Sequence, residues 1–281
     1  MPEVKPLGPY FGAEIIGLRL DEGLDDEGAE FLAAAWRRYL VLVLRDQALT
    51  PAALLALGHR LGDLDLAPPL DATRSHLDGY PQIAVVSNVV ENGEAIGGLG
   101  YGELSWHSDM TFREQPPVAC ALHAVEVPNG GDTHFLSLVD AAARLPQSLR
   151  EEIDGLRLLH DRRYTSAGTP RRDSDGEPAM THELLSIDPL SGRPCLLLGR
   201  RLNSGVVGLD EAAGRSLLDR VWKQLEDPAL ALRHVWRPGD LVLWGNLAVM
   251  HRRDAFDATA RRILHRLQFR RLLASASALP A

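Results

Sequence analysis

Apolar residues recur along the chain at two different spacings, one typical of helices and the other of strands. In residues 26–39, Leu32 and Trp36 lie one helical turn apart among alanines, which predicts an amphipathic helix. The short apolar run YLVLVL that follows predicts a buried strand. A second helix is predicted to open at Thr50 and Pro51, because threonine is a good N-cap residue and proline suits the first helical turn.

Further strands and helices follow in an irregular order. Strands are expected in residues 10–20, 83–90, 116–128, 236–246 and 261–272, and a further one after the turn PNGGD. Two stretches have helical spacing, residues 138–156 and 209–227. Between them, residues 165–181 are polar and rich in glycine and proline, which predicts a mobile loop.

This order of elements indicates the fold class. The alternation is not a regular series of strand, helix and strand, which argues against a doubly wound parallel sheet. No internal repeat and no clean linker divides the sequence. We therefore expect one domain spanning residues 1–281, mainly β with helical decoration (α+β), with a helical and loop insertion around residues 140–235.

Composition and charge narrow the possible partners. The chain has 281 residues, 45% of them hydrophobic, so it can bury a substantial core. The net charge of −8 and the dispersed basic residues argue against nucleic acid as a partner. The N-terminus lacks the apolar stretch of a secretory signal, and no apolar run is long enough to cross a membrane. Cys120 and Cys195 have no paired spacing, which indicates buried thiols and a cytoplasmic protein.

Candidate chemistry begins with the segment LSWHSDMTF, which places His107 and Asp109 two positions apart in an apolar stretch. In an extended segment both side chains would point to the same side. They would then supply two ligands of an iron site made of two histidines and one carboxylate, with His251 as the candidate for the second histidine. Alone, an H-x-D pair is a weak signal, because most such pairs are ordinary surface or hydrogen-bonded pairs.

Two arginines follow His251 and add to this candidate site. Arg262 and Arg266 are four positions apart in RRILHR, so in a strand both would face the same interior. A buried guanidinium needs an anionic partner and matches a carboxylate in bidentate geometry, which suits a dicarboxylate held beside a metal. Solvated arginines on an edge strand remain the alternative, since the spacing also fits a helix.

Several ordered motifs together resemble one known family. They are H-S-D at residues 107–109, G-G-D-T at residues 130–133, and H-x10-R-x3-R from His251 through Arg262 to Arg266. In these motifs the sequence resembles the Fe(II)- and 2-oxoglutarate-dependent dioxygenases of the taurine dioxygenase (TauD/TfdA) family.

The resemblance extends over nearly the whole chain. Other segments similar to that family, in the same order, are PLGPYFGAEIIGLRL, VLRDQALTP, LGDL, the Pro116-Pro117 pair and PGDLVLWGN. The resemblance implies a double-stranded β-helix (jelly-roll, cupin-like) core with helical decoration. It also implies Fe(II) as cofactor, 2-oxoglutarate and O2 as cosubstrates, and a small molecule as the primary substrate, with succinate and CO2 released.

The same resemblance implies roles for individual residues. His107, Asp109 and His251 match the ligands of Fe(II). Arg262 and Thr133 match the residues that hold the distal carboxylate of 2-oxoglutarate. An iron ion would satisfy the buried imidazoles and the carboxylate together, which explains their place in an apolar stretch.

At the positions expected to bind the primary substrate, the sequence matches taurine dioxygenase only in part. Arg266 matches the arginine that meets the sulfonate in taurine dioxygenase, but Ala67 stands where that enzyme has a sulfonate-binding histidine, which argues against taurine. Glu103 is either solvated or a partner for a cationic end of the substrate. Tyr101 and Trp106 either wall the pocket or belong to an aromatic core. Together these residues favour a small anionic or zwitterionic substrate.

Some expectations rest on weaker patterns. The glycine-rich segment at residues 93–103 is either a lid or an ordinary solvated loop. We also expect a homo-oligomer, either a dimer or a tetramer. Two other functions are compatible with the residues alone: a non-catalytic jelly-roll protein that binds a small anion, and a zinc-dependent hydrolase.

Overall fold

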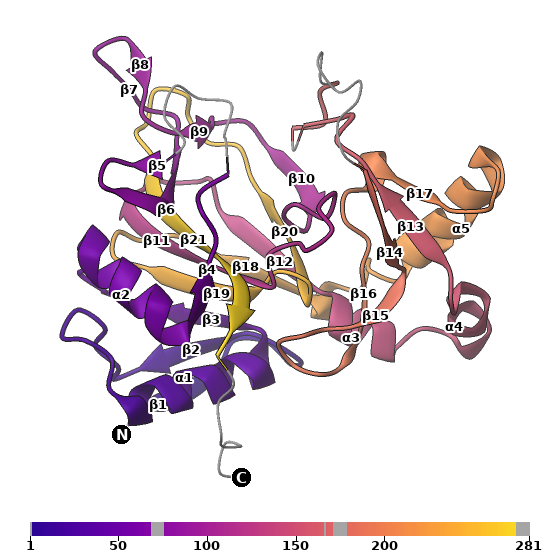
Figure 1. Ribbon diagram of the computed structural model, residues 1–281, viewed down its shortest axis with the longest axis horizontal. Helices are drawn as coiled ribbons and strands as arrows, with labels where there is room; N and C mark the ends of the chain where they lie inside the picture. Colours follow the sequence, from indigo (N-terminus) through magenta and orange to yellow (C-terminus); the bar gives the residue numbers. More distant parts are fainter. Residues whose placement is uncertain (1, 69–75, 166, 171–178, 274–281) are drawn as a thin grey trace.

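Two sheets packed face to face form the core, in a computed structural model that describes residues 2–68, 76–165, 167–170 and 179–273 (Figure 1). The larger sheet contains, in spatial order, β1 (Glu3–Pro6), β2 (Ala13–Ile16), β3 (Val41–Leu44), β19 (Leu241–Gly245), β11 (Ala119–Glu126), β21 (Ile263–Leu272), β6 (Tyr80–Ser87) and β5 (His76–Leu77). Two short strands lie off this path, β4 (Gly62–Leu64) beside β21 and β9 (Gly98–Leu99) beside β6. This arrangement is the double-stranded β-helix core that the sequence resemblance implies.

The smaller sheet faces the larger one and carries the middle of the sequence. Its strands, in spatial order, are β10 (Leu104–His107), β20 (Val249–Arg253), β12 (Thr133–Ser137) and β18 (Ala231–His234). Phe135 of β12 packs against Trp244 of β19, with ring centroids 5.7 Å apart, so aromatic rings fill the space between the sheets. A separate hairpin is formed by β7 (Val90–Glu91) and β8 (Glu94–Ala95).

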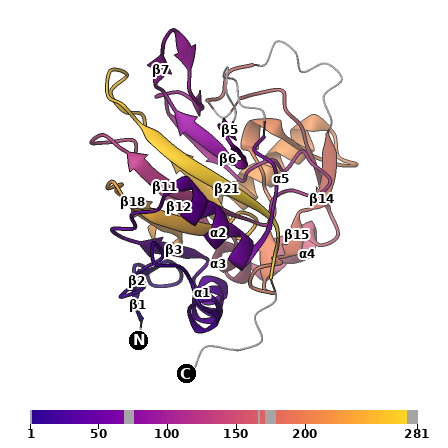
Figure 2. The same ribbon diagram turned by 60° about the vertical axis from the view of Figure 1, so that its left-hand side comes forward.

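Two helices cover the outer face of the larger sheet, as both ribbon views show (Figures 1 and 2). They are α1 (Asp26–Tyr39) and α2 (Pro51–Leu61). The Thr50 side chain accepts a hydrogen bond from Ala53 N at 3.2 Å, which confirms it as the N-cap of α2. Trp36 of α1 is buried against Phe269 with ring centroids 5.7 Å apart. Among the described residues, no helix is long and apolar enough to span a membrane.

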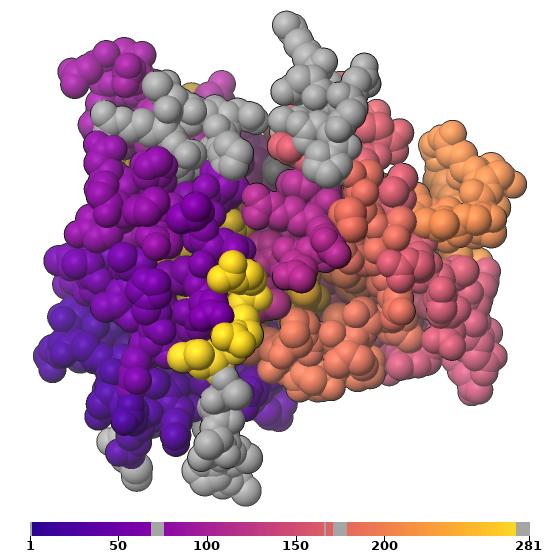
Figure 3. Space-filling view, viewed as in Figure 1, coloured from indigo at the N-terminus to yellow at the C-terminus, as the bar shows by residue number. Residues whose placement is uncertain are grey.

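The region between β12 and β18 lies at one side of the core, in pink and orange in the space-filling view (Figure 3). It contains helices and small sheets. Its helices are α3 (Leu138–Ala143), α4 (Gln147–Ile153) and α5 (Glu211–Lys223), with short 3-10 helices η1 (Arg201–Asn203) and η2 (Pro228–Leu230). Its strands are β13 (Arg157–His160), β14 (Met180–Glu183), β15 (Leu185–Ile187), β16 (Pro194–Leu196) and β17 (Ser204–Val206). The predicted insertion thus contains short strands that its sequence pattern does not reveal, and the single domain of residues 1–281 stays a prediction.

Several element boundaries differ from the sequence prediction for local reasons. The helix expected over residues 138–156 is broken into α3 and α4, because Pro146 cannot continue a helix. The strand expected over residues 10–20 shrinks to β2, since Gly12 and Gly17 at its ends both have φ of 80°. Part of the loop expected at residues 165–181 lies outside the described residues, and Met180 already begins β14.

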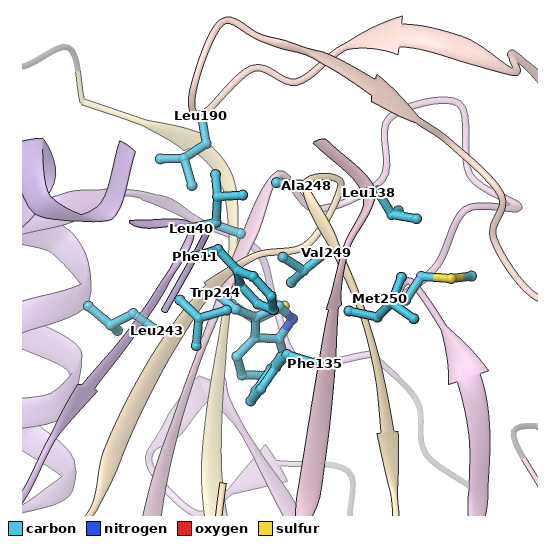
Figure 4. Close-up of a cluster of buried hydrophobic side chains, with 14 of the residues drawn as sticks. Phe11, Leu40, Phe135, Leu138, Leu190, Leu243, Trp244, Ala248, Val249 and Met250 are labelled. Carbon is cyan, nitrogen blue, oxygen red and sulfur yellow. The ribbon is translucent and has the colours of Figure 1, made fainter. Parts of the chain in front are cut away.

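An apolar cluster joins the added region to the core (Figure 4). Phe135 and Trp244 lie at its centre, and Leu138 from α3 and Leu190 from the added region lie beside them. All four side chains are at most 5% exposed. This packing fixes the added region against the two sheets that carry the candidate site.

Candidate metal centre

Three side chains that the sequence analysis singles out meet between the two sheets. His107 Nε2 lies 3.5 Å from Asp109 Oδ1, and His251 Nε2 lies 3.9 Å from the same oxygen. The three ligand atoms all lie within 4.8 Å of one another. Atoms bound to one first-row metal ion at about 2 Å are themselves separated by roughly 3 to 4 Å. The three groups are therefore close to the spacing that one metal ion requires.

Strand pairing brings the two histidines together. His107 at the end of β10 is the direct cross-strand partner of His251 in β20, so both imidazoles point to the same face. Asp109 lies beyond the end of β10, in a turn where Met110 has a φ of 57°. The extended H-x-D segment expected from the sequence is thus wrong in detail, and the turn rather than strand alternation aims the carboxylate.

Asn246, which follows β19, fixes this turn. Its side-chain oxygen accepts a hydrogen bond from Asp109 N at 2.8 Å, and its Nδ2 donates to Asp109 O at 3.0 Å and to Pro117 O at 2.8 Å. The Asn246 side chain is fully buried. One amide therefore satisfies the backbone of the turn and connects it to the larger sheet.

The two oxygens of the Asp109 carboxylate have different surroundings. Oδ2 accepts hydrogen bonds from Arg266 Nη1 at 3.0 Å and Gln268 Nε2 at 3.2 Å, and a weaker contact from Cys120 Sγ at 3.8 Å. Oδ1 faces the two imidazoles. The donors hold one oxygen in place and leave the other directed at the metal position.

The site keeps Asp109 and His251 in the protonation states that a metal requires. Burial alone would raise the pKa of Asp109, but Arg266 and the two histidines more than offset this and hold the pKa well below its usual range. Burial, followed by the charge of His107, lowers the pKa of His251 to about 3. The carboxylate is therefore ionised and the His251 imidazole neutral near pH 7.

The orientation of His107 also fits metal binding. Its Nδ1 lies 2.7 Å from Ser105 O, a bond that places the proton on Nδ1 and leaves the Nε2 lone pair free. Two imidazole nitrogens and one carboxylate oxygen on one side of an ion match the donor set of non-haem Fe(II) sites, which keep other positions open. The residues present thus fit Fe(II).

A second buried cation lies where a cosubstrate carboxylate is expected. Arg262 is 2% exposed, its Nε has no hydrogen-bond partner, and none of the described residues forms an ion pair with it. Burial, and then the charge of Arg253, lower the pKa of Arg262 to about 9, so it remains charged near pH 7. A buried guanidinium without an acidic partner is a receptor for an anion.

Thr133 lies in the same part of the site. Its Oγ1 accepts a hydrogen bond from Trp236 Nε1 at 3.0 Å, which leaves its hydroxyl proton available for an anion. The positive φ of Gly130 and Gly131 turns the chain before β12, and Gly131 packs closely on the ring of Phe256. The G-G-D-T motif thus places Thr133 beside Trp236 and near Phe256.

The structure does not bring every predicted substrate residue to the centre. Arg266 lies there, bound to Asp109. Glu103 is largely exposed and lies 3.6 Å from Arg252 Nη1, while the Arg252 guanidinium stacks on Trp106 at 5.5 Å. Trp106 directly precedes His107 in β10, and Arg252 directly follows His251 in β20. Neighbouring residues of a strand point to opposite faces, so Trp106 and Arg252 point away from the two histidines.

Two further residues bear on the substrate: Tyr101, a predicted substrate residue, and Ala67, which argues against taurine. Tyr101 is 53% exposed. Ala67 donates its backbone N–H to Pro81 O at 2.9 Å, and a methyl side chain offers no hydrogen bond to an anion. The roles of Glu103, Tyr101 and Trp106 in substrate binding stay predictions without contacts that support them.

Other residues at the site are missed by the sequence analysis. Asn246 stands in PGDLVLWGN, a segment that the resemblance flags without assigning it a role. Gln268 is two positions beyond Arg266 in β21, so strand alternation could have placed it on the same face. For Arg253 and Phe256 the local sequence carries no signal, because their contacts come from distant segments.

Comparisons with known proteins agree with this geometry. A family model described as "Taurine catabolism dioxygenase TauD, TfdA family" matches residues 3–268. The (S)-phenoxypropionate/alpha-ketoglutarate-dioxygenase of Sphingobium herbicidovorans is 29% identical, over 93% of this chain and 92% of its own. Pentalenolactone F synthase of Streptomyces arenae is 31% identical, over 94% of each chain. The crystal structure of a taurine dioxygenase from Burkholderia xenovorans has a TM-score of 0.80 at 28% identity and covers 95% of this chain and 89% of its own.

Proposed function

The chain belongs to the TauD, TfdA family of dioxygenases, and we propose that it oxidises an unactivated C–H bond of a small anionic organic substrate with Fe(II), 2-oxoglutarate and O2. The observation that carries this proposal is the joint presence of the three-residue cluster and a buried Arg262 without an acidic partner among the described residues. Metal ligands alone fit many reactions. A cationic receptor beside them favours a carboxylate cosubstrate.

The proposed reaction gives the metal ligands and their neighbours separate roles. In this proposal His107, Asp109 and His251 would hold Fe(II), and the ion would supply the activation of O2 with 2-oxoglutarate as cosubstrate. With these bound, the reaction converts 2-oxoglutarate and O2 to succinate and CO2 while one C–H bond of the substrate is oxidised. Arg266 and Gln268 keep the Asp109 carboxylate fixed during the reaction, because both donate a hydrogen bond to its Oδ2.

Arg262 and Thr133 would orient the cosubstrate. A guanidinium and a hydroxyl that both donate to the distal carboxylate fix that end of the molecule and direct its 2-oxo acid end toward the ion. The site is buried between two sheets, so these hydrogen bonds form away from bulk water, where they are strongest. The pocket would thus bind 2-oxoglutarate in one orientation before the primary substrate arrives.

The charge balance favours an anionic primary substrate. Besides Arg262, the cation Arg266 acts on the centre and lowers the pKa of His251. The charges of Fe(II) and of a doubly charged 2-oxo acid cancel, and Asp109 neutralises only one arginine. An additional carboxylate or sulfonate on the substrate would therefore be attracted to the site. The named relatives act on different molecules, so the exact substrate follows from experiment.

The test is substrate-dependent succinate formation. The protein is loaded with Fe(II) and 2-oxoglutarate without O2, and succinate is measured after O2 is admitted with aryloxy acids, sulfonates and alkyl sulfates. Each acid is matched with its neutral methyl ester. We expect succinate with at least one acid and little with its ester. The absence of succinate with every compound, or equal rates with acid and ester, would contradict the reaction or the anionic substrate respectively.

The two alternatives raised by the sequence are not supported by the comparisons. A zinc-dependent hydrolase would stay active when Zn(II) replaces Fe(II), and it would have no need of Arg262. A non-catalytic anion-binding protein would release no succinate under any condition. The homo-oligomer and the cytoplasmic location stay predictions.

A further inference from the structure

Arg253 is a second buried guanidinium beside the proposed cosubstrate pocket. It is 4% exposed and is the direct cross-strand partner of Thr133 in β12. Cross-strand partners share a face of the sheet, so the Arg253 side chain points to the same interior as the Thr133 hydroxyl. Its guanidinium carbon lies 5.4 Å from the centre of the Phe256 ring, and that of Arg262 lies 5.6 Å from the same ring.

One half of this guanidinium binds the backbone of residues 99–102, which belong to the glycine-rich segment at residues 93–103. Arg253 Nη2 donates to Leu99 O at 2.9 Å and also to Gly102 O. The backbone N–H of Phe256 donates to Tyr101 O at 3.2 Å. Three carbonyls of the segment are thus held from residues 253–256, directly after the iron-ligand candidate His251 in the chain.

The other half of the guanidinium has no hydrogen-bond partner among the described residues. Arg253 Nη1 and Nε are both buried without a hydrogen bond, and no described acidic residue pairs with this arginine. Unpaired buried N–H groups are unfavourable, the more so next to a second cation. Because Arg262 lies near the same ring with its own Nε unpaired, and the charge of Arg253 lowers the pKa of Arg262, one anion that contacts both arginines would satisfy both.

We propose that Arg253 is a further ligand of the distal carboxylate of 2-oxoglutarate, and that it couples binding of this cosubstrate to the position of residues 99–102. The inference rests on the proposed function, since it needs a dicarboxylate in the Arg262 pocket. The bound anion fixes the guanidinium, and the fixed guanidinium holds the carbonyls of Leu99 and Gly102. Cosubstrate binding would then order a segment that leads directly into β10 and His107.

A purely structural role would look different. If Arg253 only ties the segment to β20, its removal loosens residues 99–102 but leaves the affinity for 2-oxoglutarate unchanged. If it only adds charge to the pocket, removal weakens binding but the segment does not respond to the cosubstrate. The proposal requires both effects, and requires them together.

Binding measurements without turnover test the first effect. We compare the Fe(II)-loaded protein in the absence of O2 with Arg253→Met and with Arg252→Met, a neighbouring arginine that faces the opposite side and pairs with Asp254. Calorimetry should show 2-oxoglutarate binding at least about tenfold weaker in Arg253→Met, the usual effect of losing a charged hydrogen bond. Arg252→Met should bind within about twofold of the natural protein.

Hydrogen exchange of peptides covering residues 97–104 tests the second effect. We expect 2-oxoglutarate to slow exchange in the natural protein and in Arg252→Met, but not in Arg253→Met. As a ligand control, 2-oxopentanoate lacks only the distal carboxylate and should slow exchange in none of the three proteins. Unchanged affinity in Arg253→Met, or protection of the segment by 2-oxopentanoate, overturns the inference.

Two further outcomes are separable. If Arg253→Met does not fold, Arg253→Lys is measured in its place. A lysine ammonium is a point charge that cannot donate to the backbone carbonyls and to the carboxylate at once. The affinity for 2-oxoglutarate and the protection of residues 97–104 should therefore not both equal those of the natural protein. Both at natural values would overturn the inference. If the natural protein itself does not bind 2-oxoglutarate, the proposed function fails, whereas equal binding by all variants defeats only the role of Arg253.

Discussion

Arg266 Nη1 donates a 3.0 Å hydrogen bond to Asp109 Oδ2, so a buried cation touches the carboxylate whose other oxygen faces His107 and His251. The pair is at most 10% exposed in either side chain. A buried ion pair loses much of its Coulomb gain to desolvation, so its stability depends on keeping both partners. The metal-free site is therefore held by the same arginine that the resemblance assigns to substrate binding.

Removing this arginine should destabilise the metal-free protein. Arg266→Met leaves Asp109 as an uncompensated buried charge, and we expect the free energy of unfolding to fall by about 3 kcal/mol. The measurement is urea unfolding with a metal chelator present. Saturating Fe(II) should reduce the difference, because the ion then balances the carboxylate.

The matched control lies on the same strand. Arg271 of β21 pairs with Asp63 in an exposed ion pair, so Arg271→Met should change the free energy of unfolding by less than about 1 kcal/mol. Equal losses of unfolding free energy in the two variants would mean that the buried pair of Arg266 and Asp109 stabilises the fold no more than the exposed pair of Arg271 and Asp63.

Arg262→Met should act on the cosubstrate rather than on the metal. Loss of a charged hydrogen bond corresponds to about 1.5–3 kcal/mol, so we expect the KM for 2-oxoglutarate to rise roughly tenfold to a hundredfold. The Kd for Fe(II), measured without cosubstrate, should stay within about twofold. An unaltered KM for 2-oxoglutarate would remove Arg262 from the pocket.

Buried histidines should make the fold sensitive to acid. Burial lowers the pKa of His160 to about 3 and that of His265 to about 4, from a usual 6.5. The unfolded chain therefore takes up protons below pH 6.5 that the folded chain does not, and the free energy of unfolding falls as the pH decreases from about 6.5 toward 4. Unfolding in urea at pH 7, 6 and 5 measures this loss.

A variant identifies the contribution of one histidine. His265→Gln cannot take up a proton, so its stability should decline less steeply between pH 6.5 and 5 than that of the natural protein. Parallel declines would mean that His265 titrates alike in both states.

The predicted helix start at Thr50 offers a local test of the fold. Thr50→Ala removes the acceptor for Ala53 N and should lower the free energy of unfolding by about 1 kcal/mol, while Thr50→Ser should retain most of it. Thermal or urea unfolding of both variants provides the comparison. Equal stability of the alanine and serine variants would show that the cap contributes nothing.

The sequence was most informative where the physical cause is local. The start of α2 follows from Thr50 and Pro51, and α1 has the bounds that its apolar spacing predicts. The H-x-D spacing located two of the clustered side chains. His251 and the arginines required the ordered motifs of a family, because no local pattern relates residues so far apart.

Other features depend on contacts between distant segments and could not be read in advance. Asp109 is aimed by a turn that Asn246 clamps from the other sheet, so its orientation is not a property of the H-x-D segment. The hydrogen bond between Arg253 and Leu99 likewise joins β20 to β9, two strands of different sheets that do not pair with each other. Strands β13 to β17 are each three or four residues long, too short for an alternating pattern to be distinguished from a loop.

The most direct test of the central claim is a crystal structure of the protein grown without O2 in Fe(II) and 2-oxoglutarate. The account predicts one metal ion about 2 Å from Nε2 of His107, Nε2 of His251 and Oδ1 of Asp109, with the distal carboxylate of 2-oxoglutarate on Arg262. An ion bound elsewhere, or a cosubstrate whose distal carboxylate does not touch Arg262, would contradict it.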